Sequence, residues 1–236
     1  MHKAFGQHQV LKGIDLAIPA GTTCVILGGS GSGKTVMMKH MIGLLKPDQG
    51  KVVIDGEDLV PLDARELERV RRKFGMVFQF AALFDSMTVY ENVSFPLREH
   101  LKMSDDEMRE RVRSKLKIVG LAGIEDRLPS DLSGGQRKRV GLARAIVMEP
   151  KIVLYDEPTT GLDPITTDYV DHMIMDTSDA LGVTSVVISH DIASAFKVAD
   201  QVAFLDQGVI ADRGTPAQLS SSPHPAVKSY LSTWFG

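Results

Sequence analysis

A glycine-rich segment near the N-terminus has the residue types and spacing that suit phosphate binding. It follows the pattern G-x-x-x-x-G-K-[ST] and stands between an apolar run and an expected helix, the context that this pattern requires. Its glycines let backbone N–H groups approach phosphates closely, and the helix start adds partial positive charge. We expect Lys34 to reach the outer phosphates of a nucleotide and the Thr35 hydroxyl to bind Mg²⁺. The segment consists of Gly28, Gly29, Ser30, Gly31, Ser32, Gly33, Lys34 and Thr35.

A second helix start suited to anions follows later in the chain, at Ser133, Gly134, Gly135 and Gln136. Serine can cap a helix, and the two glycines precede apolar residues at helical spacing over 140–147. One chain thus carries two phosphate-facing helix starts. With one nucleotide between two such starts, the pattern predicts a head-to-tail dimer that holds two nucleotides.

Two carboxylates, Asp156 and Glu157, follow the apolar run 152–155. Asp156 suits Mg²⁺, directly or through water, because this hard cation prefers oxygen ligands. Glu157 could orient and deprotonate an attacking water. An isolated Asp-Glu pair at the end of a strand is usually a solvated turn. Here the glycine segment upstream, with Pro158 and Asp163 downstream, favours the catalytic interpretation.

Three short apolar runs, at 23–27, 151–155 and 184–188, are typical of buried strands. Each ends at a group able to do chemistry: the glycine segment, the carboxylate pair, or His190 after Ser189. A lone histidine in such a place is often only a structural hydrogen-bonding group. Because ligands gather at the carboxyl ends of parallel strands, we expect these three endings to converge.

Helices are expected between the strands. One begins at Asp163, a side-chain cap followed by proline, and another at Ser104, which with Glu107 has the spacing of a capping box. Residues 202–211 indicate a hairpin, and Thr215 begins a short helix. Residues 81–148 show no strong strand pattern, which favours a helical insertion into the core over an independent domain.

The bulk properties narrow the class of protein. A chain of 236 residues with 43% hydrophobic residues can bury a sizeable core, and a net charge of −3 gives no basic field for nucleic acid. The single cysteine, Cys24, stands in an apolar run and is expected to be a buried small hydrophobe. No stretch approaches the roughly 18 apolar residues that span a bilayer. We therefore expect a cytosolic protein that reaches a membrane only through a partner.

Taken in order along the chain, these motifs resemble the ATP-binding cassette (ABC) family, with Leu132 to Gln136 as its signature. The resemblance covers nearly the whole chain. It implies an α/β fold: a RecA-like P-loop NTPase core with an antiparallel β region and an inserted α-helical subdomain. Residues 1–236 would form a single ABC ATP-binding domain. Residues 1–80 and 149–236 would make the core with its β region, and residues 81–148 the helical subdomain that carries the signature.

The resemblance also implies roles for single residues, with ATP and Mg²⁺ as ligands. Gln79 would sense Mg²⁺ and water and connect the site to a membrane partner, and His190 would contact the terminal phosphate. Phe5 would stack on adenine, where tyrosine is commoner in the family; packing in the core is the alternative. Asp163 lies in the segment that crosses between subunits. The family has a strand before the aromatic residue, and only four residues precede Phe5 here.

A narrower resemblance lies in residues 82–93 and 95–100, which look like the ATPase of Mla-type phospholipid transporters. It implies a homodimer on the cytoplasmic face of the inner membrane that powers phospholipid transport for outer-membrane lipid asymmetry. Its partners would be permease subunits, an MCE-domain lipid-binding protein and a small regulatory subunit. An importer of small polar solutes is the main alternative. A soluble ABC ATPase acting on nucleic acid or ribosomes is disfavoured, because the chain has one cassette and no basic stripe.

Overall fold

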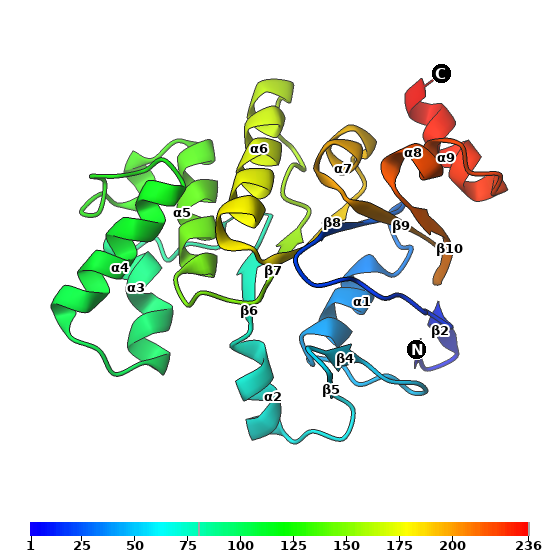
Figure 1. Ribbon diagram of the computed structural model, residues 1–236, viewed down its shortest axis with the longest axis horizontal. Helices are drawn as coiled ribbons and strands as arrows, with labels where there is room; N and C mark the ends of the chain where they lie inside the picture. The colour runs from blue at the N-terminus through cyan, green and yellow to red at the C-terminus, as the bar shows by residue number, and fades with distance from the viewer. Residues whose placement is uncertain (80, 236) are drawn as a thin grey trace.

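A six-stranded sheet forms the centre of the computed structural model, which describes residues 1–79 and 81–235 (Figure 1). From edge to edge its strands are β6 (Phe74–Val77), β7 (Ile152–Asp156), β8 (Thr184–Ser189), β3 (Thr23–Leu27), β9 (Gln201–Asp206) and β10 (Val209–Gly214). Neighbouring strands are parallel except for β9 and β10, which form the predicted hairpin. The three strands expected from the apolar runs are confirmed, and they lie side by side as β7, β8 and β3.

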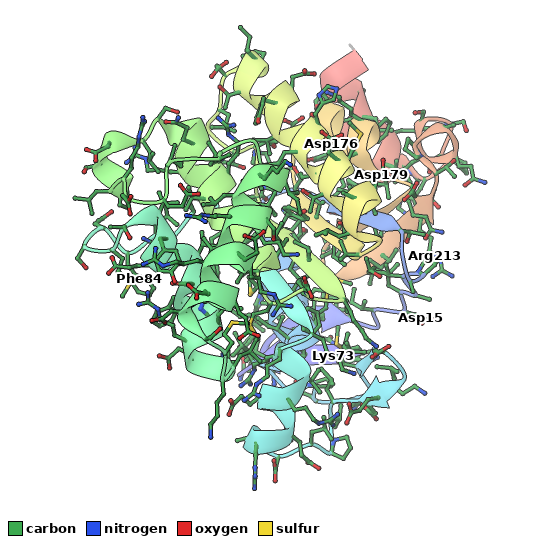
Figure 2. All side chains as sticks on the ribbon, turned by 60° about the vertical axis from the view of Figure 1, so that its left-hand side comes forward. Asp15, Lys73, Phe84, Asp176, Asp179 and Arg213 are labelled. Atoms are coloured by element: carbon green, nitrogen blue, oxygen red, sulfur yellow. The ribbon has the colours of Figure 1, made fainter. Side chains whose placement is uncertain are left out.

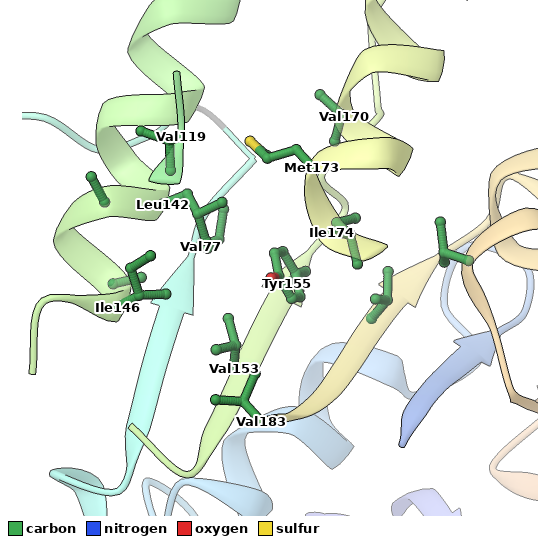
Figure 3. Packing of buried hydrophobic residues seen from close by; sticks show 14 of the residues in the cluster. Val77, Val119, Leu142, Ile146, Val153, Tyr155, Val170, Met173, Ile174 and Val183 are labelled. Carbon is green, nitrogen blue, oxygen red and sulfur yellow. The ribbon is translucent and has the colours of Figure 1, made fainter. Parts of the chain in front are cut away.

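Alternate residues of the central strands pack on opposite faces of the sheet, as the two-residue period of a strand requires. On one face Val153 and Tyr155 join a cluster with helices α5 (Gly134–Ile146) and α6 (Pro164–Leu181). Figure 3 shows Tyr155 between Leu142 and Ile146 of α5 and Ile174 of α6. On the other face Leu154 packs with methionines of α1 (Lys34–Met41), namely Met37 and Met38. These methionines are core residues.

Three long helices follow one another between β6 and β7 in sequence: α3 (Val89–His100), α4 (Asp105–Ile118) and α5, with a 3₁₀ turn η1 (Pro129–Asp131) before the last. The helix predicted after Ser104 is confirmed as α4, and Ser104 and Glu107 form the expected capping box. Met108, Val112 and Leu116 are buried on one side of α4. Figure 1 shows these helices grouped at one end of the molecule. Among the described residues, no helix is long and apolar enough to cross a bilayer.

The remaining predicted helix starts are also confirmed. Asp163 accepts hydrogen bonds from two backbone N–H groups of the first turn of α6, and Thr215 caps α8 (Pro216–Ser220). Helices α7 (Ile192–Val198) and α9 (Pro225–Phe235) flank α8 in sequence. Cys24 is fully buried, as expected, and burial raises the pKa of its thiol to about 12.

Two small antiparallel pairs complete the fold together with α2 (Ala64–Arg71). Strand β1 (His2–Phe5) pairs with β2 (His8–Lys12), and β4 (Val53–Ile54) with β5 (Glu57–Asp58). The strand that the ABC resemblance requires before the aromatic residue is therefore present, because Phe5 is the last residue of β1.

Candidate nucleotide-binding site

The glycine segment links β3 to α1 and holds Lys34 in a buried position. The Lys34 ammonium donates hydrogen bonds to the carbonyl oxygens of Gly28, at 2.7 Å, and Gly29, at 3.0 Å. Gly33 precedes the helix with a φ of 112°, and a Cβ there would lie 2.9 Å from a methyl carbon of Leu11. Both the backbone conformation and the packing therefore require glycine at this helix start.

The segment fits the phosphates of a nucleotide. Within the part of the chain that the structure describes, no side chain caps α1, so its first N–H groups need acceptors from elsewhere. The Ser32 hydroxyl is buried and has no hydrogen-bond partner among the described residues. Buried hydroxyl groups are normally satisfied, and a phosphate oxygen would satisfy this one.

Glu157 lies at the centre of the candidate site, in contact with Thr160, His190 and Lys34. Its Oε2 accepts a hydrogen bond from the Thr160 hydroxyl at 3.0 Å and lies 2.7 Å from Nδ1 of His190. Its Oε1 lies 3.7 Å from the Lys34 ammonium. The backbone of Glu157 has a φ of 50°, which is uncommon for a residue other than glycine, and its N–H donates to the Ile188 carbonyl. Such local strain is found at functional sites more often than elsewhere.

The predicted convergence of the strand ends is confirmed by the register of the sheet. Asp156 of β7 lies opposite Ile188 of β8, and Ser189 lies opposite Leu27, the residue before the glycine segment. The chain thus brings the glycine segment, the carboxylate pair and His190 together at the carboxyl ends of the parallel strands, as expected for ligand sites in parallel sheets.

Burial, together with nearby charges, shifts the pKa values of Lys34 and Asp156. Burial lowers the pKa of Lys34, although the neighbouring carboxylates of Glu157 and Asp156 partly offset this shift. Burial also raises the pKa of Asp156, and the charge of Glu157 adds to the effect. A cation bound beside Asp156 would offset both causes. Oxygen ligands for Mg²⁺ are available from Asp156, the exposed Thr35 and the half-buried Gln79, which is the donor chemistry that this ion prefers.

The second helix start, at α5, differs from the first because side chains of the same chain cap it. Ser133 and Gln136 cap each other: the Gln136 N–H donates to the Ser133 hydroxyl, and the Ser133 N–H donates to the Gln136 side chain. Ser133 and Gly134 are exposed. A Cβ at Gly134 or Gly135 would meet no heavy atom within 4 Å. In Figure 1, α5 belongs to the helical group while α1 lies under the central strands, so one chain does not bring the two starts together.

The other predicted residues occupy exposed or half-buried positions. Phe5 is 48% exposed at the end of β1, with the Lys3 ammonium 5.6 Å from its ring centre, so the alternative of a core aromatic is wrong. Asp163 is exposed at the start of α6. Their roles toward a nucleotide or a second subunit stay predictions, as do those of Thr35 and Gln79.

Three contributors to the site were not predicted. Thr160 binds Glu157, Lys138 donates to the Pro158 carbonyl at 2.5 Å, and Tyr230 donates to the His190 carbonyl at 2.7 Å. Thr160 stands three residues after Glu157, so attention to that segment could have found it. Tyr230 has no signal in the sequence, because 40 residues separate it from His190.

A groove of about 500 Å³ opens between α2, α3 and α5. Residues of the stretches 82–93 and 95–100 line it, including Phe84, which lies at the surface of the helical group (Figure 2). Three arginines also line it, and the sequence had not indicated these: Arg71 at the end of α2, Arg72 directly after it, and Arg144 of α5. The Arg144 guanidinium donates to two successive carbonyl oxygens, of Ala81 and Ala82, just after Gln79.

Comparisons with known proteins identify the family and the relatives that this chain resembles. The family described as ABC transporter matches residues 11–160. The probable ribonucleotide transport ATP-binding protein mkl of Mycobacterium tuberculosis (strain H37Rv) is 44% identical over 229 residues, which cover 97% of this chain and 64% of that protein. The intermembrane phospholipid transport system ATP-binding protein MlaF of Escherichia coli (strain K12) is 38% identical over 226 residues, which cover 96% of this chain and 84% of that protein.

Solved structures show the same fold. CbiO1 from Clostridium perfringens, part of the ABC transporter complex cbiONQ, superimposes with a TM-score of 0.88 at 31% identity, covering 99% of this chain and 92% of that one. MJ0796, a bacterial ABC transporter cassette in a dimeric structure, gives a TM-score of 0.80 at 35% identity, covering 91% and 95%. Sequence, site geometry and fold together lead to one conclusion: this chain belongs to the ABC transporter family.

Proposed function

We propose that this chain binds ATP with Mg²⁺ and hydrolyses it. Lys34 and the N–H groups at the start of α1 would hold the phosphates, while Thr35, Asp156 and Gln79 would hold the metal. Bound Mg²⁺ would neutralise charge that develops on the phosphate oxygens. MJ0796, 35% identical, is also described in a post-hydrolysis state bound to ADP and phosphate, which supports the assignment.

Glu157 is the proposed general base. Thr160 and His190 hold its Oε2, so the carboxylate has a defined orientation at the edge of the sheet. It would accept a proton from water as the water oxygen attacks the terminal phosphorus and the bond to the leaving ADP breaks. His190 would contact the terminal phosphate through the ring nitrogen that does not face Glu157.

The start of α5 is our reason to propose that two copies of the chain share each nucleotide-binding site. Helical glycines destabilise a helix relative to alanine, and neither packing nor a positive φ requires Gly134 or Gly135. Close approach of a ligand from outside the chain gives a physical reason for both. We infer a homodimer in which Ser133, Gly134, Gly135 and Gln136 of one subunit face ATP on the other, with Asp163 beside the crossing point.

We further propose that ATP binding and hydrolysis power phospholipid transport for the maintenance of outer-membrane lipid asymmetry. MlaF, 38% identical, is named for intermembrane phospholipid transport. The chain would lie on the cytoplasmic face of the inner membrane, with the groove next to Phe84 receiving a permease subunit. An MCE-domain protein and a small regulatory subunit would complete the complex. The name of mkl, 44% identical, favours ribonucleotides instead, and so keeps import of small polar solutes as the second candidate. The chain spans only 64% of the length of mkl.

Glu157→Gln tests the proposed chemistry. Glutamine keeps the size of the side chain but cannot accept a proton, so ATP should still bind while turnover falls on the order of 10²-fold or more. Phosphate release and ATP affinity are the two measurements. Turnover close to that of the unaltered chain would remove Glu157 from the role.

Affinity purification of the tagged chain from detergent-solubilised native membranes tests the substrate. Mass spectrometry that finds a multi-spanning permease, an MCE-domain protein and phospholipid would support lipid transport. A permease with a soluble solute-binding protein would assign the chain to solute import instead.

A further inference from the structure

The C-terminal helix α9 reaches the loop that carries His190. The Tyr230 hydroxyl donates a hydrogen bond to the carbonyl oxygen of His190 at 2.7 Å. The ring of the same histidine lies 2.7 Å, through Nδ1, from Oε2 of Glu157. A single residue therefore connects α9 to the carboxylate proposed as general base.

Tyr230 is itself firmly placed. It shares a face of α9 with Val227 and Leu231, three residues before it and one after, and both of these are buried in the main cluster. Its ring packs on Phe204, with 5.0 Å between ring centres. Phe204 of β9 lies opposite Leu27, the last residue before the glycine segment. The hydroxyl is thus anchored to the same sheet that carries the phosphate-binding loop.

The Tyr230 hydroxyl also remains a donor across the neutral range. Burial, with the nearby charges of Glu157 and Asp191, raises the pKa of this phenol to about 12. A protonated phenol can keep its hydrogen bond to a carbonyl oxygen at any pH at which the protein would work.

The position of His190 requires a stabilising contact of this kind. Its side chain is 53% exposed, and it stands in the short connection between β8 and α7. On one side of it the Asp191 N–H donates to the Ser189 hydroxyl at 2.9 Å, which shapes the connection locally. The Tyr230 contact adds an anchor from a distant element.

We propose that Tyr230 is a positioning residue for His190: it fixes the backbone of His190 so that the imidazole meets Glu157. Turnover then depends on α9 more strongly than ATP affinity does. This inference rests on the proposed function, in which Glu157 and His190 act on ATP.

Tyr230→Phe is the decisive change, because it keeps the ring on Phe204 and removes only the donor. We expect the turnover number to fall roughly three- to tenfold, the size of one lost neutral hydrogen bond. The ATP dissociation constant should change less than turnover does, and the melting temperature should fall by no more than a few degrees, because one neutral hydrogen bond is lost. Tyr169→Phe is the matched control: it removes a tyrosine hydroxyl from the exposed side of α6 and should leave turnover unaltered.

NMR of ¹⁵N-labelled imidazole groups, in the full chain, reports on His190 directly. With its signal identified through His190→Ala, we expect Tyr230→Phe to shift the His190 resonance and leave those of the other histidines in place. Unchanged turnover, an unchanged His190 signal, or a fall in ATP affinity equal to the fall in turnover would each overturn the proposal. If His190→Ala kept full turnover, the role of His190 in the proposed function would fail, and the imidazole shift would still test the contact.

Discussion

The two helix starts that resemble phosphate sites, at α1 and α5, differ in how the chain caps and buries them. At α1 no side chain caps the helix, and the buried Lys34 reaches back to the carbonyl oxygens of the loop. At α5 Ser133 and Gln136 cap each other at the surface. At the first start Gly33 and Lys34 are buried by their own chain, whereas at the second Ser133 and Gly134 are exposed.

The glycines show what this difference means. A Cβ at Gly28 would lie 2.2 Å from the Leu205 carbonyl oxygen, so the fold itself excludes any larger residue there. Gly134 and Gly135 meet nothing within 4 Å, and their φ values are not positive. Folding alone would favour alanine at these two positions. Glycine at Gly28 and Gly33, on the way into α1, thus serves the structure of one chain, while at α5 we infer that it serves a contact with something else.

The largest expected effect comes from Ser133→Arg. A bulky cation at the exposed start of α5 should abolish the ATP-dependent dimer, while loss of the cap should cost the monomer only about 1 kcal/mol of unfolding free energy. Light scattering with ATP, in the slow Glu157→Gln background, measures the dimer. Ser114→Arg, the same change on the exposed side of α4, is the control. A dimer that survives Ser133→Arg would refute the shared site.

Gly28→Ala should destabilise the fold even without nucleotide. The added Cβ cannot avoid the backbone of Leu205, so we expect a loss of about 3 kcal/mol of unfolding free energy, as for severe overpacking. Urea denaturation measures it. Gly29→Ala is the matched control, because a Cβ there meets nothing within 4 Å. Equal unfolding free energies of Gly28→Ala and Gly29→Ala would show that the fold does not require glycine at position 28.

Lys34→Ala should weaken ATP binding on the order of 10- to 100-fold, the value of a charged hydrogen bond to phosphate. Calorimetric titration with ATP gives the dissociation constant. The exposed Lys39 of the same helix offers the control change Lys39→Ala, which should leave affinity nearly unaltered. Unchanged affinity in Lys34→Ala would contradict its assignment to the phosphates.

Gly134→Ala has the smallest expected effect on the fold, and the opposite sign. Alanine at this helical position should raise the unfolding free energy by about 0.5 kcal/mol. The same Cβ should weaken the ATP-dependent dimer, because it intrudes where phosphates would approach. A variant that is more stable and also dimerises normally would remove our reason for glycine at α5.

Much of the fold could be predicted because its signals are local. Apolar runs identified the three central strands, and capping residues marked the starts of α4, α6 and α8 within one residue. The glycine segment and the pair Asp156-Glu157 were recognisable by residue type and spacing. Each of these signals lies within a few consecutive residues, where backbone preference and short-range hydrogen bonding act.

The sequence by itself therefore determined which residues are equipped for phosphate and proton chemistry. Only the tertiary structure decided which of them meet. Lys34, Glu157 and His190 come together because β3, β7 and β8 pair in a particular register. Tyr230 and Arg144 gain their roles from hydrogen bonds to carbonyl oxygens, and every residue has a carbonyl group. Such an acceptor leaves no mark in composition or spacing, so these contacts become visible only when strands and helices distant in sequence have packed.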